Sequence, residues 1–190
     1  PYSHFPARRS TYGDTNSQER KCVMTSFAQL FKDTRSALSE DEAHAIARFD
    51  VSSQGKNGLH REVRIRDFSV EVDEPPALGG QDKAPNPVEY ALAALATCQE
   101  ITYRLHADAL GIPLRDVSVR LEGELDLRGF FGAAEGVRPG FRRITGEVHF
   151  DSSASKEELA RLKVVVDAHC PVLDLFSNAT PVEIAVAGHA

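Results

Sequence analysis

The stretch of sequence that decides the fold is NPVEYALAALATC, from Asn86 to Cys98. Asn86 is a favourable N-cap residue, Pro87 suits the first helical position, and Glu89 completes a capping box three residues after the cap. The residues that follow are apolar almost all round, which is typical of a helix buried on several sides. A glycine and a proline end the pattern, so the sequence predicts one long core helix over 87–110.

On either side of this helix, strand-like and helical patterns succeed one another. Apolar residues on every second position indicate half-buried strands, and glycine, asparagine and proline residues mark the turns between them. Ser155 and Glu158 repeat the capping-box signature, which predicts a second helix. The expected strands lie at 46–51, 63–72, 117–127, 144–150 and 182–186, and the second helix at about 156–169. This order predicts an α+β fold with helices on antiparallel sheet.

The size and composition of the chain limit its organisation and its partners. In 190 residues we expect an N-terminal extension over 1–45, helical in part, and one domain over 46–190. The net charge of −6 argues against nucleic acid, and no apolar run approaches the roughly 20 residues of a membrane span. The absence of metal-ligand and nucleotide-binding motifs predicts no cofactor. The first residues lack the layout of a secretory signal, which favours a cytoplasmic location.

The chain has three cysteines, Cys22, Cys98 and Cys170, whose spacing fits neither a disulfide framework nor a structural zinc site. Widely separated cysteines of this kind are either small core residues or reactive thiols. Cys98 lies in the predicted core helix, where packing alone explains it. Cys170 ends the second helix, and Pro171 biases it away from helical geometry. The residues by themselves leave both explanations open.

Segments around the two later cysteines, and one between them, form a family-like pattern. They are 73–75 (DEP), 79–80 (GG) and 86–98, then 136–141 (GVRPGF), then 168–172 (AHCPV) followed by Asn178, Thr180 and Pro181. This pattern resembles the OsmC/Ohr family over roughly residues 46–186. The resemblance implies an OsmC-like fold with an antiparallel sheet, two central helices and an intertwined homodimer.

The resemblance also implies an enzymatic function, the thiol-dependent reduction of organic hydroperoxides and of hydrogen peroxide. Cys98 would be the attacking thiol, Cys170 the resolving thiol, and Glu89 the family glutamate at the start of the cysteine helix. The resulting Cys98–Cys170 disulfide would be reduced by an external thiol or dithiol, for example one of the lipoyl type.

A thiol with a pKa near 8.5 is mostly protonated at neutral pH and needs a nearby cation or hydrogen-bond donor to become a thiolate. In the hydroperoxide-resistance branch of the family, an arginine in the first hairpin turn has this role. The similar turn here, Gly55–Gly58, contains Lys56, which is a point charge and does not reproduce the planar arginine fork. Arg64 and Arg66 on the following strand are the alternatives.

Helix geometry limits what Glu89 can do. Nine residues separate it from Cys98, which places the two on opposite faces of the helix and roughly 13 Å apart along its axis. Glu89 therefore either only caps its own helix or acts across a dimer interface, beside the partner's helix.

Two other functions compete with the peroxidase. One is a non-catalytic OsmC-like protein that binds a small hydrophobic ligand. The other is a thiol redox sensor that forms the Cys98–Cys170 disulfide without peroxide turnover.

Overall fold

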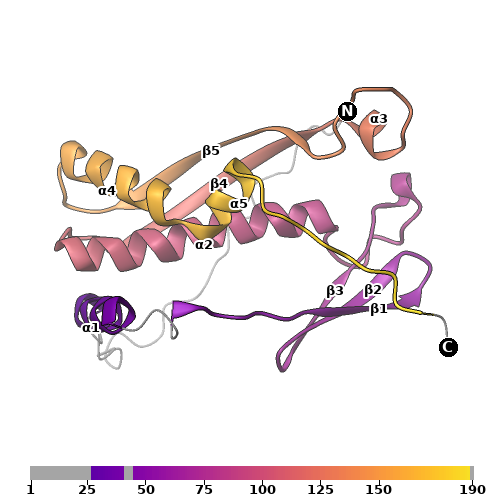
Figure 1. Cartoon of the computed structure of the whole chain (residues 1–190). Coiled ribbons are helices and arrows are strands. Elements are labelled where there is room, and N and C mark those ends of the chain that lie inside the picture. The colour runs from indigo at the N-terminus through magenta and orange to yellow at the C-terminus, as the bar shows by residue number, and fades with distance from the viewer. Residues whose placement is uncertain (1–26, 41–44, 189–190) are drawn as a thin grey trace, which may run out of the picture.

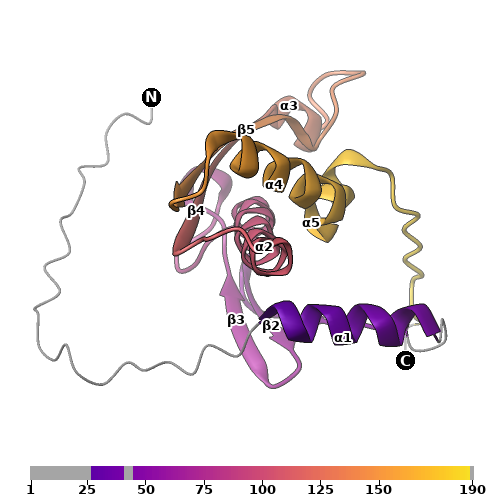
Figure 2. The same ribbon diagram turned by 90° about the vertical axis from the view of Figure 1, so that its left-hand side faces the viewer.

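The computed structural model describes residues 27–40 and 45–188, so Cys22 lies outside the described residues. Helix α2 (Pro87–Leu110) runs through the middle of the molecule (Figure 1). The strands β4 (Asp116–Leu125) and β5 (Phe141–Asp151) pair antiparallel beside it. Figure 2 shows α4 (Lys156–His169) and α5 (Pro171–Ser177) on one side of α2, and α1 (Phe27–Glu40) on the opposite side.

A second, separate sheet lies at the N-terminal end of α2 (Figure 1). Its three antiparallel strands follow the order β1-β2-β3. The short helix η2 lies between β3 and α2, and the short helix α3 lies between β4 and β5. These elements are β1 (Ser52–Asn57), β2 (His60–Ile65), β3 (Phe68–Val72), η2 (Pro76–Leu78) and α3 (Leu127–Phe130). The α+β class and the antiparallel pairing are confirmed, although the described part of the chain forms two sheets and not one. No helix in residues 27–40 and 45–188 is long and apolar enough to span a membrane.

Helix α2 begins and ends as its sequence predicts. The Asn86 side-chain oxygen accepts a hydrogen bond from the Glu89 N–H at 3.0 Å, and the Glu89 carboxylate accepts one from the Asn86 N–H at 2.8 Å. Gly111 ends the helix at a φ of 67°, in the left-handed region that favours glycine. These bonds satisfy backbone groups that a helix end otherwise leaves without partners.

Only one face of α2 is buried within the chain, which corrects the prediction of burial on several sides. Its buried residues recur about every four positions, the spacing of one helix face. They are Leu95, Gln99, Thr102, Tyr103 and Ala107. The opposite face exposes Ala93, Ala94, Thr97 and Ile101, and the Ile101 side chain is 63% exposed. Among the described residues of a single copy, this apolar face of α2 therefore has no covering element.

The hydrophobic core lies where α2 and α4 meet the β4–β5 pair. The Tyr103 and Phe150 rings meet edge to face at 5.1 Å, and Leu162 and Val166 of α4 are fully buried beside them. The predicted second helix is confirmed, because the Ser155 and Glu158 capping box is present at the start of α4. The alternating burial along β4 is confirmed as well.

Two of the expected strands are wrong. The first strand is Ser52–Asn57 and not 46–51, where Phe49 is 93% exposed. The segment 182–186 contains no strand, and Ile184 is 90% exposed. Both segments have a strand-like pattern, but a strand needs a partner for its backbone hydrogen bonds, and none lies beside them in the described part of the chain.

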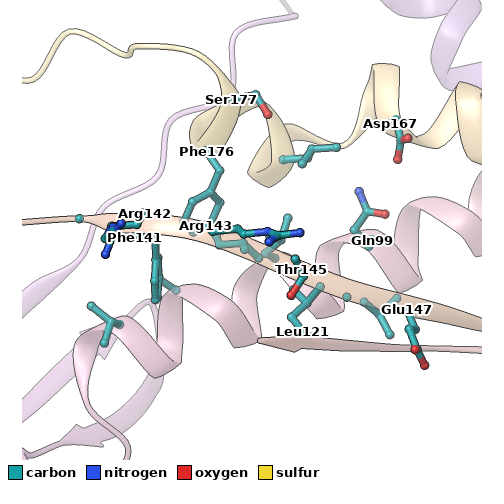
Figure 3. A pocket seen from close by; sticks show the side chains of 18 of the residues that line it. Gln99, Leu121, Phe141, Arg142, Arg143, Thr145, Glu147, Asp167, Phe176 and Ser177 are labelled. Carbon is teal, nitrogen blue, oxygen red and sulfur yellow. The ribbon is translucent and has the colours of Figure 1, made fainter. Parts of the chain in front are cut away.

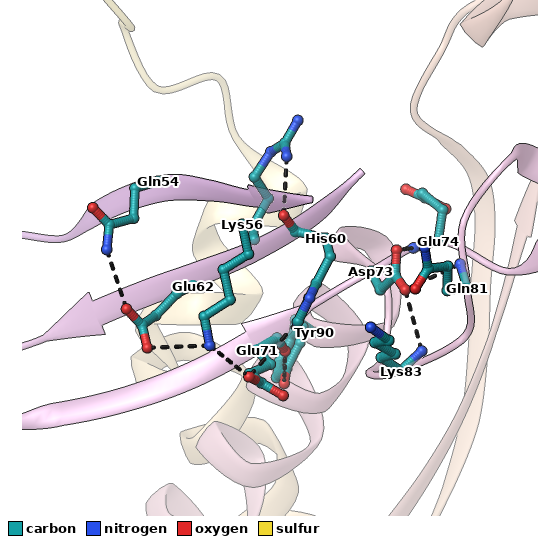
Figure 4. Close-up of polar contacts among 11 residues, drawn as sticks. Gln54, Lys56, His60, Glu62, Glu71, Asp73, Glu74, Gln81, Lys83 and Tyr90 are labelled. Carbon is teal, nitrogen blue, oxygen red and sulfur yellow. Dashed lines mark hydrogen bonds and ion pairs between the residues drawn. The ribbon is translucent and has the colours of Figure 1, made fainter. Parts of the chain in front are cut away.

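The DEP and GG motifs form the loop that leads into α2. Asp73 is 1% exposed, and its carboxylate accepts hydrogen bonds from the backbone N–H groups of Glu74, Gln81 and Lys83 (Figure 4). A Cβ on Gly80 would lie 1.7 Å from the Glu74 carbonyl oxygen, so only glycine fits there. This motif therefore has a structural role, which is to hold the start of α2 against β3.

Candidate functional site

The structure brings the thiols of Cys98 and Cys170 together, although 72 residues separate them in sequence. Cys98 lies on α2, and Cys170 lies at the junction of α4 and α5. The Cys170 thiol donates a hydrogen bond to the Cys98 sulfur, with the two Sγ atoms 3.4 Å apart. Both cysteines are free thiols in this structure. A disulfide places its sulfurs about 2.05 Å apart, so a small movement would join them.

Pro171 explains why Cys170 points toward α2. The residue before a proline is disfavoured in helical geometry, and Cys170 has the extended values φ −80° and ψ 110°. Its N–H still donates to the Val166 carbonyl at 2.9 Å, and its own carbonyl accepts from the Asp174 N–H at 3.1 Å. One residue thus ends α4 and begins α5, and its backbone is held by a hydrogen bond to each helix.

The two sulfurs differ in exposure. Cys170 is 2% exposed, whereas Cys98 is half-buried. Burial raises the pKa of the Cys98 thiol, and the backbone amide of Val172 lowers it in part. A charge on the neighbouring Cys170 would raise it further. Among the described residues, none of these influences comes from a cation, and a cation is what usually lowers the pKa of a reactive thiol.

The raised pKa predicts how Cys98 responds to pH. Alkylation requires the thiolate, and below the pKa the thiolate fraction grows about tenfold per pH unit. The rate at which iodoacetamide labels Cys98 should therefore rise about tenfold per unit between pH 7 and 9, as followed by peptide mass spectrometry. A rate that levels off below pH 8 would contradict this account, because it would require a cation close to the sulfur.

Lys56 contacts carboxylates of its own sheet and not the thiol pair. It lies near the end of β1, before the turn at Gly58, and its Nζ is 2.9 Å from Glu71 and 3.4 Å from Glu62 (Figure 4). The hydrogen bond to Glu71 raises the pKa of Lys56, and the same bond lowers the pKa of Glu71. The raised pKa keeps Lys56 protonated, and the carboxylates of Glu62 and Glu71 balance its positive charge.

The two alternative cations also lie on this sheet. Arg64 is 3.7 Å from Glu62, and the Arg66 guanidinium lies 5.1 Å from the centre of the Phe68 ring. Arg66 adopts a φ of 54° in the turn between β2 and β3. In the described part of a single chain, all three candidate cations thus have contacts other than Cys98.

Glu89 is likewise not brought to the thiols of its own chain. Its carboxylate caps α2 through the Asn86 N–H and is exposed. The capping explanation of Glu89 is confirmed, and a role toward a partner's thiol stays a prediction.

One side chain near the thiols, that of Tyr103, was missed by sequence reasoning. Tyr103 is fully buried, and its hydroxyl has no hydrogen-bond partner within the described residues. Burial, then the neighbouring Asp167 and Cys170, raise the pKa of Tyr103. His106 packs 5.0 Å from the ring of His169, and burial lowers its pKa. In the sequence, the only sign of Tyr103 is its spacing of four residues from Gln99 and Ala107 on the same helix face. This spacing predicts a core position and no chemical role.

A cavity of about 760 Å³ lies beside the cysteine pair, between α2, β5 and α5 (Figure 3). Neither sulfur lines it, but Gln99 follows Cys98 and Leu173 lies three residues after Cys170. In residues 27–40 and 45–188, no cluster of three His, Cys, Asp or Glu side chains could hold a metal ion.

The fold and site together define an α+β protein with two adjacent thiols next to a cavity. A family model described as OsmC-like protein matches residues 80–185, more than half of the chain. The chain therefore belongs to the OsmC-like family. No curated protein matches it.

Solved structures of the family share the fold. The OsmC-like protein of Mycoplasma pneumoniae is 20% identical, with a TM-score of 0.60 over 69% of this chain and 88% of that one. An organic hydroperoxide resistance protein of Legionella pneumophila is 24% identical, with a TM-score of 0.55 over 69% and 90%. An OsmC-like protein of unknown function from Vibrio cholerae is 10% identical, with a TM-score of 0.56 over 68% and 94%. At these identities the likeness shows the fold alone.

Proposed function

We propose that this protein is a thiol-dependent peroxidase that reduces organic hydroperoxides, and hydrogen peroxide as well, through Cys98 and Cys170. The observation that carries the proposal is the 3.4 Å separation of two free sulfurs from distant parts of the chain. Membership of a family in which some solved structures are named organic hydroperoxide resistance proteins supports it. We also propose a cytoplasmic location, where thiols are kept reduced.

The proposed reaction uses the sulfurs in order of exposure. The Cys98 thiolate attacks the distal peroxide oxygen, the O–O bond breaks, and the alkoxide takes a proton and leaves as an alcohol. Cys98 is then a sulfenic acid. The Cys170 sulfur attacks the Cys98 sulfur and displaces the hydroxyl group as water, which forms the disulfide. An external dithiol returns two electrons and two protons and is itself oxidised to a disulfide.

The test is peroxide turnover by the pure full-length chain. Cumene hydroperoxide should be consumed when dihydrolipoamide is present, and the amount consumed should exceed the amount of protein many times. The matched control is the double variant Cys98→Ser/Cys170→Ser, which should match the rate without protein. Equal rates for the wild type and this variant would overturn the proposal.

A redox sensor is the second candidate, because burial raises the pKa of Cys98 and no cation among the described residues contributes to that pKa. A thiol that reacts slowly with peroxide suits occasional oxidation better than rapid catalytic turnover. A sensor would form the disulfide once for each chain but would not consume excess peroxide in the turnover assay.

We also propose that the protein is a homodimer. Large apolar side chains are exposed on α2 and on the two unpaired strand-like segments, among them Ile101, Phe49 and Ile184. Burying such surface is the main driving force of association, and the segments 46–51 and 182–186 need strand partners. A second copy supplies both. In such a dimer, Glu89 would lie beside the partner's helix, where it could act on the partner's site.

The dimer is tested by light scattering at low micromolar concentration. The wild type should have twice the 20.8 kDa mass of the chain. Ile101→Glu places a charge on the exposed face of α2 and should shift the mass toward one copy, with the helical circular dichroism retained. A wild-type mass of one chain would contradict the dimer and the proposed role of Glu89 together.

A further inference from the structure

The hydroxyl group of Tyr103 is a buried group that packing does not explain. Tyr103 is fully buried on α2, and its hydroxyl has no hydrogen-bond partner among the described residues. A buried polar group without a partner lowers the stability of the fold. The Tyr103 ring packs edge to face against Phe150 at 5.1 Å, and a phenylalanine would keep this contact without that loss. A hydroxyl at this position therefore indicates a chemical role.

The polar side chains near Tyr103 have other partners. Asp167 lines the cavity with Gln99 (Figure 3), and its carboxylate is bound by Lys163 at 2.5 Å. The Thr102 hydroxyl donates to the Cys98 carbonyl at 2.7 Å. In the reduced protein, the Tyr103 hydroxyl is therefore free to donate a hydrogen bond to a group that becomes charged during a reaction.

Cys170 lies on the face of α4 that packs against Tyr103. Leu162, Val166 and Cys170 recur every four residues along this face, and all three are buried. Leu162 and Val166 share a core cluster with Tyr103. Helix side chains lean toward the N-terminus, which takes the Tyr103 ring toward the turn that carries Cys98. Burial, and then neighbouring charges that include Cys170, raise the pKa of Tyr103, so the hydroxyl and the Cys170 sulfur are close enough to interact.

The second step of the proposed reaction places negative charge on Cys170. Its S–H is directed at the Cys98 sulfur, 3.4 Å away. The proton can pass to the hydroxyl group of the Cys98 sulfenic acid, which leaves as water while the S–S bond forms. The charge then develops on a sulfur whose residue is only 2% exposed, so water stabilises it poorly. A buried charge of this kind needs a hydrogen-bond donor.

We propose that the Tyr103 hydroxyl donates a hydrogen bond to the Cys170 sulfur while that sulfur attacks Cys98, and thereby speeds disulfide formation. The inference rests on the proposed function, because it concerns the second step of the same reaction. Tyr103 has no part in the first step, in which Cys98 meets the peroxide. The reduced protein thus carries an unpaired hydroxyl that gains a partner only during the reaction.

The first test separates the two steps in Tyr103→Phe. Wild type and variant are full-length chains that both carry Cys22→Ser, so that only the two site thiols react. After one equivalent of cumene hydroperoxide, rapid quenching with an alkylating reagent and mass spectrometry follow each step. Peroxide consumption should be unchanged. Disulfide formation should slow about tenfold or more, because hydrogen bonds to charged groups have at least this effect, and the Cys98 sulfenic acid should accumulate.

The pH dependence of disulfide formation gives a readout that a purely structural role would not change. Without the donor, a thiolate at Cys170 is less stable. The pH at which the rate reaches half its maximum should therefore rise by about one unit in Tyr103→Phe, which corresponds to a tenfold loss of thiolate. The same midpoint in both proteins would contradict the proposed hydrogen bond.

The second test needs no peroxide. Cys98 attacks the aromatic disulfide DTNB and releases one coloured thiolate, and Cys170 then attacks Cys98 and releases a second as the protein disulfide forms. Tyr103→Phe should slow the second release about tenfold and leave the first unchanged. Equal second rates would overturn the role of Tyr103. A slowed second release in a protein that does not turn over peroxide would overturn the peroxidase alone and support the role of Tyr103.

Tyr90→Phe is the matched control, the same substitution on the same helix. The Tyr90 hydroxyl donates to the Glu71 carbonyl at 2.7 Å, so its removal should lower the midpoint of thermal unfolding and leave both DTNB steps unchanged. Tyr103→Phe removes an unpaired hydroxyl and should raise the midpoint by about 2–4 °C. A variant that is more stable but slower in the second step supports the proposal. A lowered midpoint in Tyr103→Phe, or equal slowing in the control, would overturn it.

Discussion

A Cys98→Ser protein should lose peroxide turnover by a factor on the order of 10³ or more, because no other group supplies the nucleophile of the first step. Sulfenic acid should be undetectable in this variant with a dimedone-type trapping reagent. The substitution is nearly isosteric and Cys98 is only half-buried, so thermal unfolding should change little. Retained turnover in Cys98→Ser would show that the attacking thiol has been assigned wrongly.

The Cys170→Ser protein should behave differently from Cys98→Ser. It keeps the attacking thiol, so one equivalent of peroxide should be consumed rapidly and a stable sulfenic acid should form on Cys98. Turnover with a dithiol should then be slow, because the resolving sulfur that lies 3.4 Å away is gone. If Cys170→Ser no longer consumes the first equivalent of peroxide, the nucleophile is the buried sulfur of Cys170 and not that of Cys98.

The largest effect on stability is expected from Val166→Ala. Val166 is fully buried in the core between α4 and α2, and the substitution removes about two methylene-sized groups and leaves a cavity. The cost should be about 2 kcal/mol in the free energy of unfolding, or roughly 4–8 °C in the midpoint of thermal unfolding for a chain of this size. Differential scanning calorimetry measures both quantities.

Val164→Ala is the matched control for this prediction. It is the same substitution on the same helix, two residues earlier, at a side chain that is 70% exposed. Its cost should stay within about 0.5 kcal/mol. Equal losses for the two variants would contradict the assignment of the core.

Those parts of the fold that depend on neighbouring residues were predictable from sequence. The capping boxes at Asn86 and Ser155 act over three residues, and both helices begin where they predict. The turn of Cys170 away from helical geometry depends on the next residue alone, and it was predictable for the same reason. Periodicity likewise predicted the alternating burial of β4.

The predictions that failed concern features that depend on residues distant in sequence or on another chain. Residues 46–51 and 182–186 have the composition of strands, but no pattern within them shows what they would pair with. The uniformly apolar start of α2 predicted burial on several sides, and one chain covers only one face. Both failures concern surface that the proposed homodimer would cover.

The candidate site was predictable only through its family resemblance. Composition left open whether Cys98 and Cys170 are core residues or reactive thiols, since no local pattern brings together sulfurs that are 72 residues apart. The placement of Lys56 was not predictable, because it depends on the carboxylates of Glu62 and Glu71 across the sheet.

The central claim is that Cys98 and Cys170 are one redox pair. Its most direct test is to add one equivalent of cumene hydroperoxide to the reduced full-length protein, block the remaining thiols and map the peptides by mass spectrometry. The account predicts a disulfide between Cys98 and Cys170 in most chains, with Cys22 recovered as a blocked thiol. Recovery of Cys170 as a blocked thiol, with Cys98 either unmodified or oxidised alone, would contradict it.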